Sequence, residues 1–443
     1  MLEEEIKCGE SLTLELKREL PSRDKKVMKT FVAFANGCGG KVVFGVDNGT
    51  LDIVGVADDD RARLQDAVTD MISDTCTPQL LPSFSWQTVN EKSLFVVEIP
   101  ASTQCPYYIK SEGLEKGVYV RVGATTRQAS AEKVRELQLR GQNKTYDAVV
   151  EHAVPPATQK EIETLCREIS EYVGSVEKPV GINQLVGWEL LKKEGRTYLP
   201  SNAFRLLTGD GLHFSGIQCA VFQGVERVTF LDRKEFRGPV YEQLENAQRF
   251  LMQYLRKAAI IEGTRRNDVY EIPIEALREI IANAILHRNY LVHAYVQVSV
   301  FDDRVEVLSP GGLFDNLSKA EMMAGLSRLR NPLLAGIFHR MGIVERWGTG
   351  INRVLCACEK AKLLPPDFEV TGDSLRVTIK RPAAVAAKKK AERKRRPHKR
   401  DEALLEYLIN HPDAPLQQVA DAFFVSVSTV WRFVQDMKAE GKL

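Results

Sequence analysis

Apolar residues recur with two different periods along this 443-residue chain. Alternation with period two predicts β-strands, and it is clearest at 41–46, 93–99, 117–123, 296–301 and 304–310. A period near 3.6 predicts helices, most strongly at 241–257 and 274–288. Because helices and strands intermingle and Gly- and Asp-rich turns separate them, the pattern predicts an α+β multidomain fold.

Changes in this pattern mark the expected domain boundaries. Strand signals end before residue 383, and residues 401–443 show three short helical segments. We therefore expect an N-terminal α/β domain, a connecting α/β region, a second α/β domain, a linker and a three-helix domain. Their expected ranges are 1–140, 145–270, 271–382, 383–400 and 401–443.

The composition favours a globular protein inside the cell. Hydrophobic residues make up 44% of the chain and charged residues 27%, which is typical of globular domains. The sequence contains no run of eighteen apolar residues, and its first twenty residues are too charged for a secretory signal. We therefore expect no membrane span. The eight cysteines are scattered, so we expect reduced core thiols and a cytoplasmic location.

The formal net charge of +2 conceals one strongly basic segment. Residues 388–400 contain nine Lys or Arg and one Glu, which leaves about −6 for the rest of the chain. Such a block is either a solvated linker or a segment that binds phosphates through counterion release. Its position beside a three-helix domain favours the second interpretation. The expected phosphate contacts here are Lys388, Lys389, Lys390, Arg393, Lys394, Arg395 and Arg396.

The C-terminal helices have the spacing of a DNA-reading module. Two helices are expected at 402–409 and 416–423, and a third begins after Ser426. The spacing resembles winged helix-turn-helix regulators, which implies that the third helix meets base edges. The residues expected at that surface are Ser428, Thr429, Arg432 and Gln435. A small three-helix cluster that contacts another protein is the alternative.

Two segments of the N-terminal domain carry candidate chemistry. The segment ESLTLELK begins at Glu10, and AFANGCGGKVVFGVD ends at Asp47. Together they resemble the paired signature of the Schlafen-type AlbA domain, a nucleic-acid-binding family with some metal-dependent endonucleases. The resemblance implies that Glu10, Glu15 and Asp47 hold a divalent metal as catalytic residues and that Lys17 contacts a phosphate. Further expected nucleic-acid contacts in the same groove are Lys110, Arg121 and Arg127.

The second α/β domain offers a nucleotide site of another kind. No G-x-x-x-x-G-K-[ST] motif occurs in the chain, which excludes an ordinary P-loop. On the helix expected at 274–288, Glu279 and Asn283 are four residues apart and therefore lie one above the other. This pair could be an ordinary solvated polar face, or it could line a cavity in which Asn283 binds Mg²⁺ and Glu279 orients or deprotonates water.

The segments that follow this helix favour the cavity. A strand hairpin leads to a glycine pair, and a second glycine segment precedes a further helix. This order resembles the gyrase, Hsp90, histidine-kinase and MutL (GHKL) ATPase superfamily, an α/β sandwich, in a divergent form. The resemblance implies ATP and Mg²⁺ as ligands, with Asn283 on the metal and Glu279 as the catalytic acidic residue. The nucleotide contacts that it implies are Ser309, Gly311, Gly312, Gly348, Thr349 and Gly350.

One position departs from that superfamily's pattern. Its first glycine segment usually begins with an Asp that reads the adenine amino group, and Ser309 stands there in this chain. The lid between the glycine segments, roughly 314–329, is also short, so the sequence leaves hydrolysis open.

The interpretation we favour is an ATP-responsive, nucleic-acid-binding transcriptional regulator. The alternative is an ATP-regulated, metal-dependent nuclease, for example a defence factor, and a third option is a degenerate ATPase that assembles partners. The sequence does not decide whether the nucleic acid is DNA or RNA, which signal the regulator responds to, or whether the protein forms a homo-oligomer. The region 145–270 is expected to couple the domains and to carry no chemistry.

Overall fold

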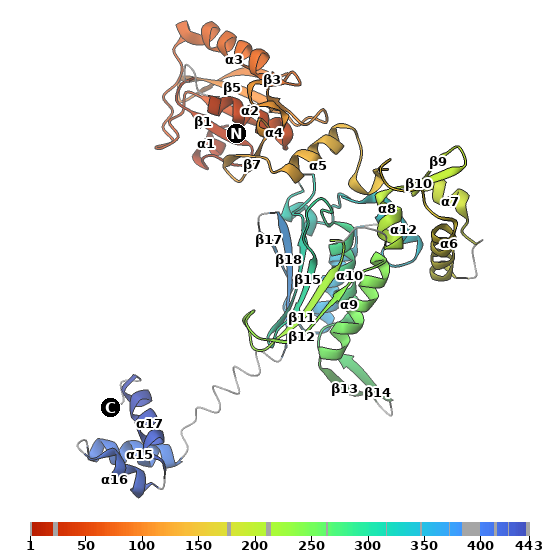
Figure 1. Cartoon of the computed structure of the whole chain (residues 1–443). Helices are drawn as coiled ribbons and strands as arrows, with labels where there is room; N and C mark the ends of the chain where they lie inside the picture. The colour runs from red at the N-terminus through yellow and green to blue at the C-terminus, as the bar shows by residue number, and fades with distance from the viewer. Residues whose placement is uncertain are drawn as a thin grey trace. The chain divides into compact units, whose positions relative to one another are not determined.

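A computed structural model divides the chain into two compact units, Met1–Arg381 and Pro382–Leu443 (Figure 1). Among the residues that it describes, no helix is both long and apolar enough to cross a bilayer. The described residues are 2–20, 25–174, 179–209, 214–262, 265–315, 317–345, 348–371, 373–382, 399–411, 414–423 and 425–439.

The N-terminal part of the first unit is built on a four-stranded sheet in the order β1-β2-β5-β4. β1 runs parallel to β2, and the other neighbours are antiparallel. Leu14 and Leu16 of β1 are buried, so the intervening Glu15 and the following Lys17 lie on the opposite face of the strand. The strands are β1 (Leu14–Lys17), β2 (Gly39–Phe44), β4 (Ser83–Val89) and β5 (Lys92–Pro100).

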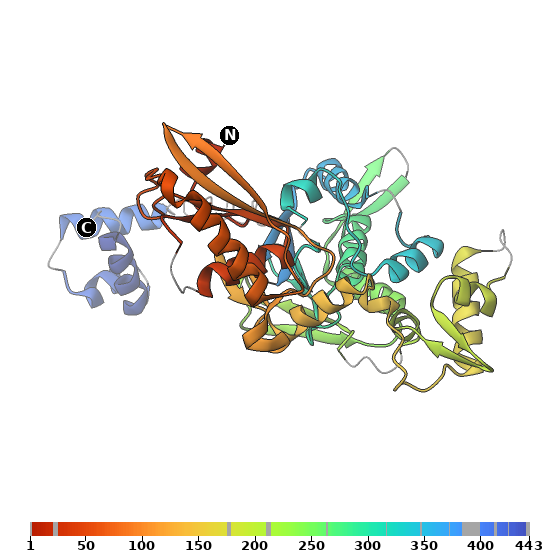
Figure 2. The ribbon, with the colours of Figure 1, turned by 90° about the horizontal axis from the view of Figure 1, so that it is seen from above.

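Helix α2 (Lys25–Asn36) packs on this sheet and supplies the centre of its core. Phe31 and Phe34 are fully buried in one cluster with Phe44 and Phe95 of the sheet. The long β4–β5 hairpin is orange in Figure 2. The surrounding elements are α1 (Leu2–Lys7), η1 (Asp58–Asp60), α3 (Arg61–Thr75), β3 (Cys76–Thr77), β6 (Tyr108–Ile109), η2 (Lys110–Glu112), α4 (Gly113–Lys116), β7 (Tyr119–Val122), β8 (Thr125–Gln128) and α5 (Ala131–Gly141).

Helix α5 ends against the backbone that precedes β6. A Cβ atom at Gly141 would lie 1.7 Å from the carbonyl oxygen of Cys105, so a side chain there requires the backbone to move. We expect Gly141→Ala to lower the free energy of unfolding by about 1–3 kcal/mol, as overpacking does, measured by thermal or urea denaturation.

Gly336, inside helix α12 (Pro332–Arg340), is the matched control because a Cβ there meets nothing within 4 Å. Gly336→Ala should leave the stability unchanged or raise it by up to about 1 kcal/mol. Equal destabilisation by the two substitutions would contradict the close-approach argument.

A six-stranded sheet in the order β12-β11-β15-β16-β18-β17 forms the centre of the rest of the first unit. β11 and β15 are parallel, and the other neighbours are antiparallel. Two of its strands, β11 and β12, come from the region expected to connect the domains. The strands are β11 (Ile217–Phe222), β12 (Phe230–Phe236), β15 (Val296–Val300), β16 (Arg304–Pro310), β17 (Asp367–Thr371) and β18 (Ser374–Lys380).

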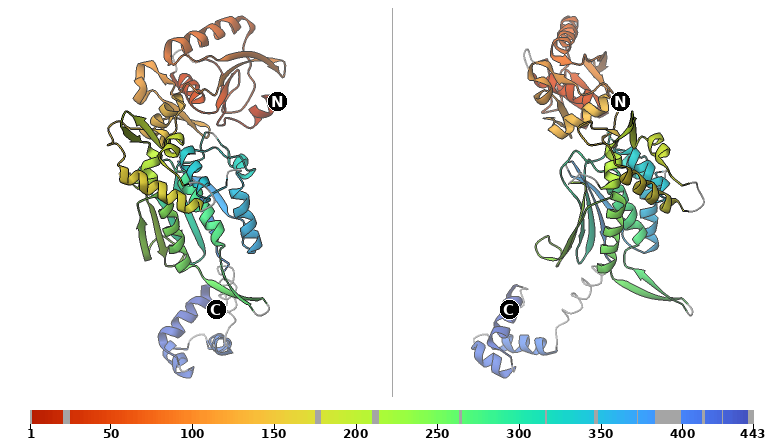
Figure 3. Two further views of the ribbon diagram at one scale, coloured as in Figure 1. Left: turned by 90° about the vertical axis from the view of Figure 1, so that its right-hand side faces the viewer. Right: turned by 45° about the vertical axis from the view of Figure 1, so that its right-hand side comes forward.

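Helices α9 (Val240–Tyr254) and α10 (Ile274–Leu286) lie along one face of this sheet (Figure 3). They confirm the helices predicted at 241–257 and 274–288. The apolar stripe of α10, which includes Leu277 and Ile281, is buried in one continuous core with α9 and the sheet. Helix α13 (Gly350–Lys360) packs along the other side of α10.

The same core extends into a smaller group of elements that precede β11. Its helices α6 and α8 contact α12, and α8 also contacts α9. The remaining elements of the first unit are η3 (Tyr146–Ala148), α6 (Gln159–Val173), α7 (Ile182–Gly187), β9 (Leu191–Glu194), β10 (Thr197–Pro200), α8 (Asn202–Thr208), β13 (Lys257–Glu262), β14 (Arg265–Tyr270) and α11 (Lys319–Met323).

The second unit contains the three helices that the sequence predicts. They enclose a small core of Leu404, Leu408, Val419, Ala420 and Val430. The helices are α15 (Lys399–Asn410), α16 (Leu416–Ala422) and α17 (Val427–Ala439).

Candidate functional site

A cavity of about 470 Å³ lies between α10, the six-stranded sheet and the segments that follow β16. Glu279 and Asn283 line it from successive turns of α10. The Nδ2 atom of Asn283 donates a hydrogen bond to Oε1 of Glu279 at 3.3 Å. Most of the remaining wall is apolar, with Val307 of β16 and Val377 of β18 on the sheet side. The two polar groups are therefore placed together in a pocket whose wall is mostly apolar.

Both glycine segments also line this cavity, at Gly311, Gly312, Gly348 and Gly350. Gly311 has a φ of 99°, and a Cβ there would lie 2.8 Å from Cβ of Asn289. A Cβ at Gly350, the first residue of α13, would lie 2.1 Å from Oε1 of Glu279. The glycines thus allow one backbone segment to approach α10 closely and another to approach the residues just after it.

The carboxyl group of Glu279 sits beside the N-terminus of α13. Its burial raises its pKa, and the positive charge of Arg353 and the hydrogen bond from Asn283 partly offset this. Arg353 itself pairs with Glu345 at 3.0 Å, and Thr349 donates to Glu345 at 3.3 Å. A partly buried carboxyl with a raised pKa is suited to accepting or donating a proton.

Ser309 lies in the cavity wall at the end of β16 and is 5% exposed. Its hydroxyl donates a hydrogen bond to the carbonyl oxygen of Ala284 at 2.9 Å. The bond ties the sheet to α10 and commits the hydroxyl proton to the backbone.

Several cavity residues were not singled out from the sequence. His287 lines the cavity one turn after Asn283, and Arg328 and Phe314 line it from the lid. Arg330 lies behind Phe314, with its guanidinium 5.0 Å from the ring centroid. The i, i+4 spacing of Asn283 and His287 was the signal that could have identified the histidine.

The glycine loop after β16 is bound to helix α5 of the N-terminal part. Arg330 donates to the carbonyl of Gly312 at 2.9 Å and pairs with Glu136 of α5 at 3.5 Å. Asn289 donates to the same Glu136 carboxylate at 3.2 Å. Lys133 pairs with Glu136 at 2.8 Å. Glu136 therefore joins α5 to two residues that flank the cavity.

A second contact runs through Asp315. Arg328 of the lid donates to its Oδ2 at 3.0 Å, and Arg140 of α5 pairs with its Oδ1 at 3.5 Å. Arg140 also donates to the carbonyl of Asn36, the last residue of α2, at 3.5 Å. The lid is thus linked to the N-terminal core through α5.

Asp147 in η3 makes a third link and is fully buried. Its Oδ2 accepts hydrogen bonds from the backbone N–H groups of Leu333 and Leu334 in the first turn of α12, at 2.7 and 3.1 Å. Thr145 donates to Oδ1 at 2.6 Å. Burial raises the pKa of Asp147 to about 6, although these hydrogen bonds act in the opposite direction.

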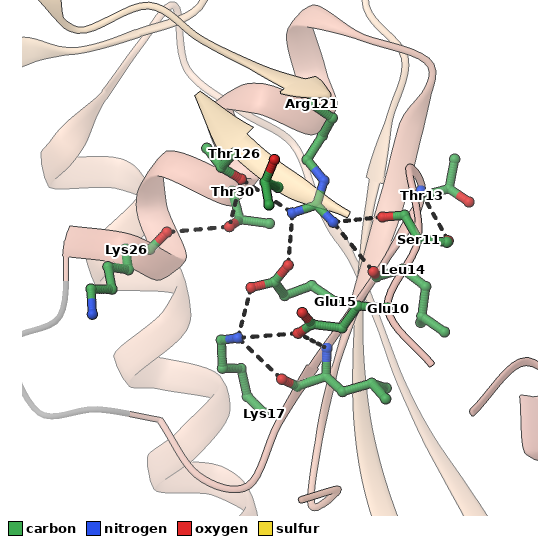
Figure 4. A network of polar contacts seen from close by, with 12 residues as sticks. Glu10, Ser11, Thr13, Leu14, Glu15, Lys17, Lys26, Thr30, Arg121 and Thr126 are labelled. Carbon is green, nitrogen blue, oxygen red and sulfur yellow. Dashed lines mark hydrogen bonds and ion pairs between the residues drawn. The ribbon is translucent and has the colours of Figure 1, made fainter. Parts of the chain in front are cut away.

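In the N-terminal part the structure brings Glu10, Glu15 and Lys17 together (Figure 4). The Lys17 ammonium lies 2.6 Å from Glu15 and 3.5 Å from Glu10. Arg121 of β7 binds the other Glu15 oxygen at 2.7 Å and also donates to the carbonyl of Ser11. Because two cations neutralise two carboxylates and the Arg121 side chain is only 3% exposed, this arrangement holds β1 and β7 together.

Asp47 is placed in a local turn. Its Oδ1 accepts hydrogen bonds from the N–H groups of Gly49 and Thr50 at 2.9 and 3.1 Å, and these bonds lower its pKa. Arg18 approaches its Oδ2 at 3.7 Å. Within the described ranges, no group of three or more His, Cys, Asp or Glu is positioned to hold a metal ion. The three-carboxylate metal site stays a prediction that this geometry does not support.

Some of the remaining expected nucleic-acid contacts are exposed in the structure, and others lie outside the residues that it describes. Arg127 on β8 and Lys110 are exposed, and Lys110 donates to the carbonyl of Ser73 at 2.9 Å. Gln435 on α17 is exposed, as is the neighbouring Trp431. The side chains of Ser428, Thr429 and Arg432, and the expected linker contacts from Lys388 to Arg396, lie outside the described residues.

Three family models match the chain. Residues 10–130 match "Schlafen, AlbA_2", residues 293–379 match "Putative ATP-dependent DNA helicase recG C-terminal", and residues 398–443 match "Winged helix-turn-helix DNA-binding". No curated protein matches the chain significantly.

Among the solved structures that match, one is similar to most of the chain and another to a smaller part of it. The crystal structure of the DIP2311 protein from Corynebacterium diphtheriae shares 20% identity over 96% of this chain and 87% of that one, with a TM-score of 0.45. The solution structure of the N-terminal domain of a putative ATP-dependent DNA helicase RecG-related protein from Nitrosomonas europaea shares 31% identity over 29% of this chain and 90% of that one, with a TM-score of 0.23.

The family matches define a multidomain protein that joins a Schlafen AlbA_2 domain and an ATPase-like domain to a DNA-binding winged helix-turn-helix domain. The chain carries, in order, a Schlafen AlbA_2 domain, an ATPase-like domain of the recG C-terminal family and a winged helix-turn-helix domain. This is the architecture that the sequence motifs indicate.

Proposed function

We propose that this protein is an ATP-binding transcriptional regulator whose contacts with DNA depend on the bound nucleotide. The observation that carries the proposal is the cavity in which Glu279 and Asn283 face the two glycine segments. The ATPase-like and winged helix-turn-helix matches support a nucleotide and a DNA partner. The arrangement of a polar helix, a hairpin and two glycine segments supports a divergent GHKL-type site.

The residues present fit Mg²⁺ and a triphosphate. Because Nδ2 of Asn283 donates to Glu279, its amide oxygen remains for a hard cation. When bound, the metal would neutralise phosphate charge. Gly350 begins an eleven-residue helix, whose first N–H groups favour an anion, and Arg328 adds a cation from the lid.

The contacts of α5 provide a route from nucleotide to the N-terminal domain. Arg330 donates to the carbonyl of Gly312, which lines the cavity, and also pairs with Glu136 of α5. Arg328, which also lines the cavity, donates to Asp315, and Arg140 of α5 pairs with the same carboxylate. A phosphate that draws Arg328 away from Asp315 would weaken that link, because a guanidinium binds phosphate oxygens strongly. We therefore propose that nucleotide changes how α5 and the AlbA-type domain are held.

The Schlafen-like nuclease is the less favoured function for the N-terminal domain. Glu10 and Glu15 are paired with Lys17 and Arg121, and Asp47 caps its own turn. These contacts occupy the carboxylates that a catalytic metal would need, which disfavours cleavage.

The site is tested by calorimetry with ATP in Mg²⁺ and in EDTA. Asn283→Ala should remove the metal-dependent part of the affinity, about tenfold or more, which corresponds to about 1.4 kcal/mol. Glu279→Ala should mainly lower any hydrolysis, because its carboxyl would act on water. The control is Asn183→Ala, an exposed asparagine of α7. Equal ATP affinities of wild type and Asn283→Ala in Mg²⁺ would overturn the assignment.

A further inference from the structure

The end of α10 is fastened to the first glycine segment on both sides of His287. Before it, the carbonyl of Ala284 accepts from Ser309 at 2.9 Å. After it, the N–H of Asn289 donates to the carbonyl of Pro310 at 2.8 Å. His287 lies between these two attachments and lines the cavity. The backbone at His287 is therefore held beside the segment from Ser309 to Gly311, and its side chain lines the same cavity as that segment.

The separation along α10 suits the two ends of a nucleoside triphosphate. His287 follows Glu279 by eight residues and Asn283 by four, so the three side chains form one stripe. Eight residues of helix rise about 12 Å. That distance is on the scale of the separation between a purine ring and its terminal phosphates. With Glu279 beside α13 at the phosphate end, the base belongs at the His287 end.

We propose that His287 is a specificity residue that accepts a hydrogen bond from the 6-amino group of adenine and so selects adenine over 6-oxopurines. This inference rests on the proposed binding of ATP in the same cavity. Val307, Leu375 and Val377 line the cavity from the sheet and would contact the faces of the base.

The chemical state of His287 suits this role. Burial lowers its pKa to about 4 and the charge of Arg330 acts in the same direction, whereas a hydrogen bond to the backbone of Arg328 raises it. The imidazole is therefore neutral at pH 7. A neutral imidazole has one N–H and one bare nitrogen. With the N–H donated to the Arg328 carbonyl, the bare nitrogen can accept from an amino group and repels a carbonyl oxygen.

Ser309 is the competing candidate for the same contact. Its hydroxyl proton is committed to Ala284, but its oxygen could still accept. Ser309 is buried, whereas His287 is partly exposed toward the cavity. The geometry therefore favours His287.

The test compares dissociation constants for ATP and inosine triphosphate, which carries a 6-oxo group, using the full chain in Mg²⁺. Wild type should prefer ATP by about tenfold or more, equal to about 1.4 kcal/mol. His287→Phe keeps a ring but no acceptor and should bring the ratio near one through weaker ATP binding. His287→Gln, which keeps an acceptor, should retain part of the preference. His339→Phe is the control, because His339 also lines the cavity but contacts the carbonyl of Val344.

Four outcomes would overturn the inference. Equal binding of the two nucleotides by wild type removes the selectivity that it explains. Loss of the preference in Ser309→Ala but not in His287→Phe assigns the contact to the serine. If wild type binds neither nucleotide, the proposed function fails as well. If ATP binds and Asn283→Ala weakens it while His287→Phe keeps the preference, the inference alone fails.

Discussion

Deleting residues 383–443 should flatten the salt dependence of duplex-DNA binding by about four units in the slope of log K against log salt concentration. Each phosphate neutralised contributes roughly −0.9 to this slope. Residues 388–400 offer nine cations, and about half of them engaged gives the expected change. Titrations of the full chain and the truncated chain at several salt concentrations measure it. ATP binding should persist, because the cavity residues all precede the deletion.

Two sets of substitutions separate the parts of the tail. Neutralising Lys388, Lys389, Lys390, Arg393, Lys394, Arg395 and Arg396 should weaken binding to all sequences alike, because phosphates carry no sequence information. Changing Thr429, Arg432 and Gln435 on α17 should instead erode the preference for one sequence. An unchanged slope after the deletion would contradict the prediction. It would place the salt-sensitive DNA contacts in the N-terminal domain and leave the helices as a protein-contact module.

Local periodicity was sufficient to predict most elements near the candidate site. The alternation at 296–301 and 304–310 gave β15 and β16, and the 3.6-residue period at 274–288 gave α10. Local periodicity could not predict which strands pair with each other when they are far apart in the sequence. β11 pairs with β15 across more than seventy residues, and nothing in either segment specifies the partner.

The residues around the candidate cavity likewise divide into those that local sequence could identify and those that only long-range contacts reveal. Glu279, Asn283 and the glycines could be named from spacing and resemblance, because each acts through its own helix or loop. Glu136 could not, since its partner Arg330 lies 194 residues away. The Arg121–Glu15 contact spans 106 residues, so the sequence placed Arg121 among the expected nucleic-acid contacts, whereas its guanidinium is buried in this ion pair. Asp47 is different, because an Asp followed by Asn-Gly-Thr is a local turn signal from which its hydrogen bonds to Gly49 and Thr50 could have been predicted.

Asp147 should make the stability of the protein fall as the pH rises from about 4 to about 6. Its folded-state pKa is about 6, above the usual 3.8, so between these values the unfolded chain has released a proton that the folded chain retains. Stability decreases with pH wherever the folded state binds more protons. A shift of this size corresponds to about 3 kcal/mol, present in full below the unfolded pKa and lost above the folded one.

Asp147→Asn isolates this contribution. The amide oxygen can still accept from Leu333 and Leu334, and the Thr145 hydroxyl can rotate to accept from the amide nitrogen, but the side chain no longer ionises. We expect the free energy of unfolding of the variant to rise relative to wild type by about 2–2.5 kcal/mol between pH 4 and pH 7, because a small part of the effect is already lost at pH 4. Urea denaturation of both proteins at each pH measures the difference, in which the other titrating groups cancel. A difference that does not change with pH would show that burial does not perturb Asp147. A difference that falls would mean that the hydrogen bonds from α12 outweigh its burial.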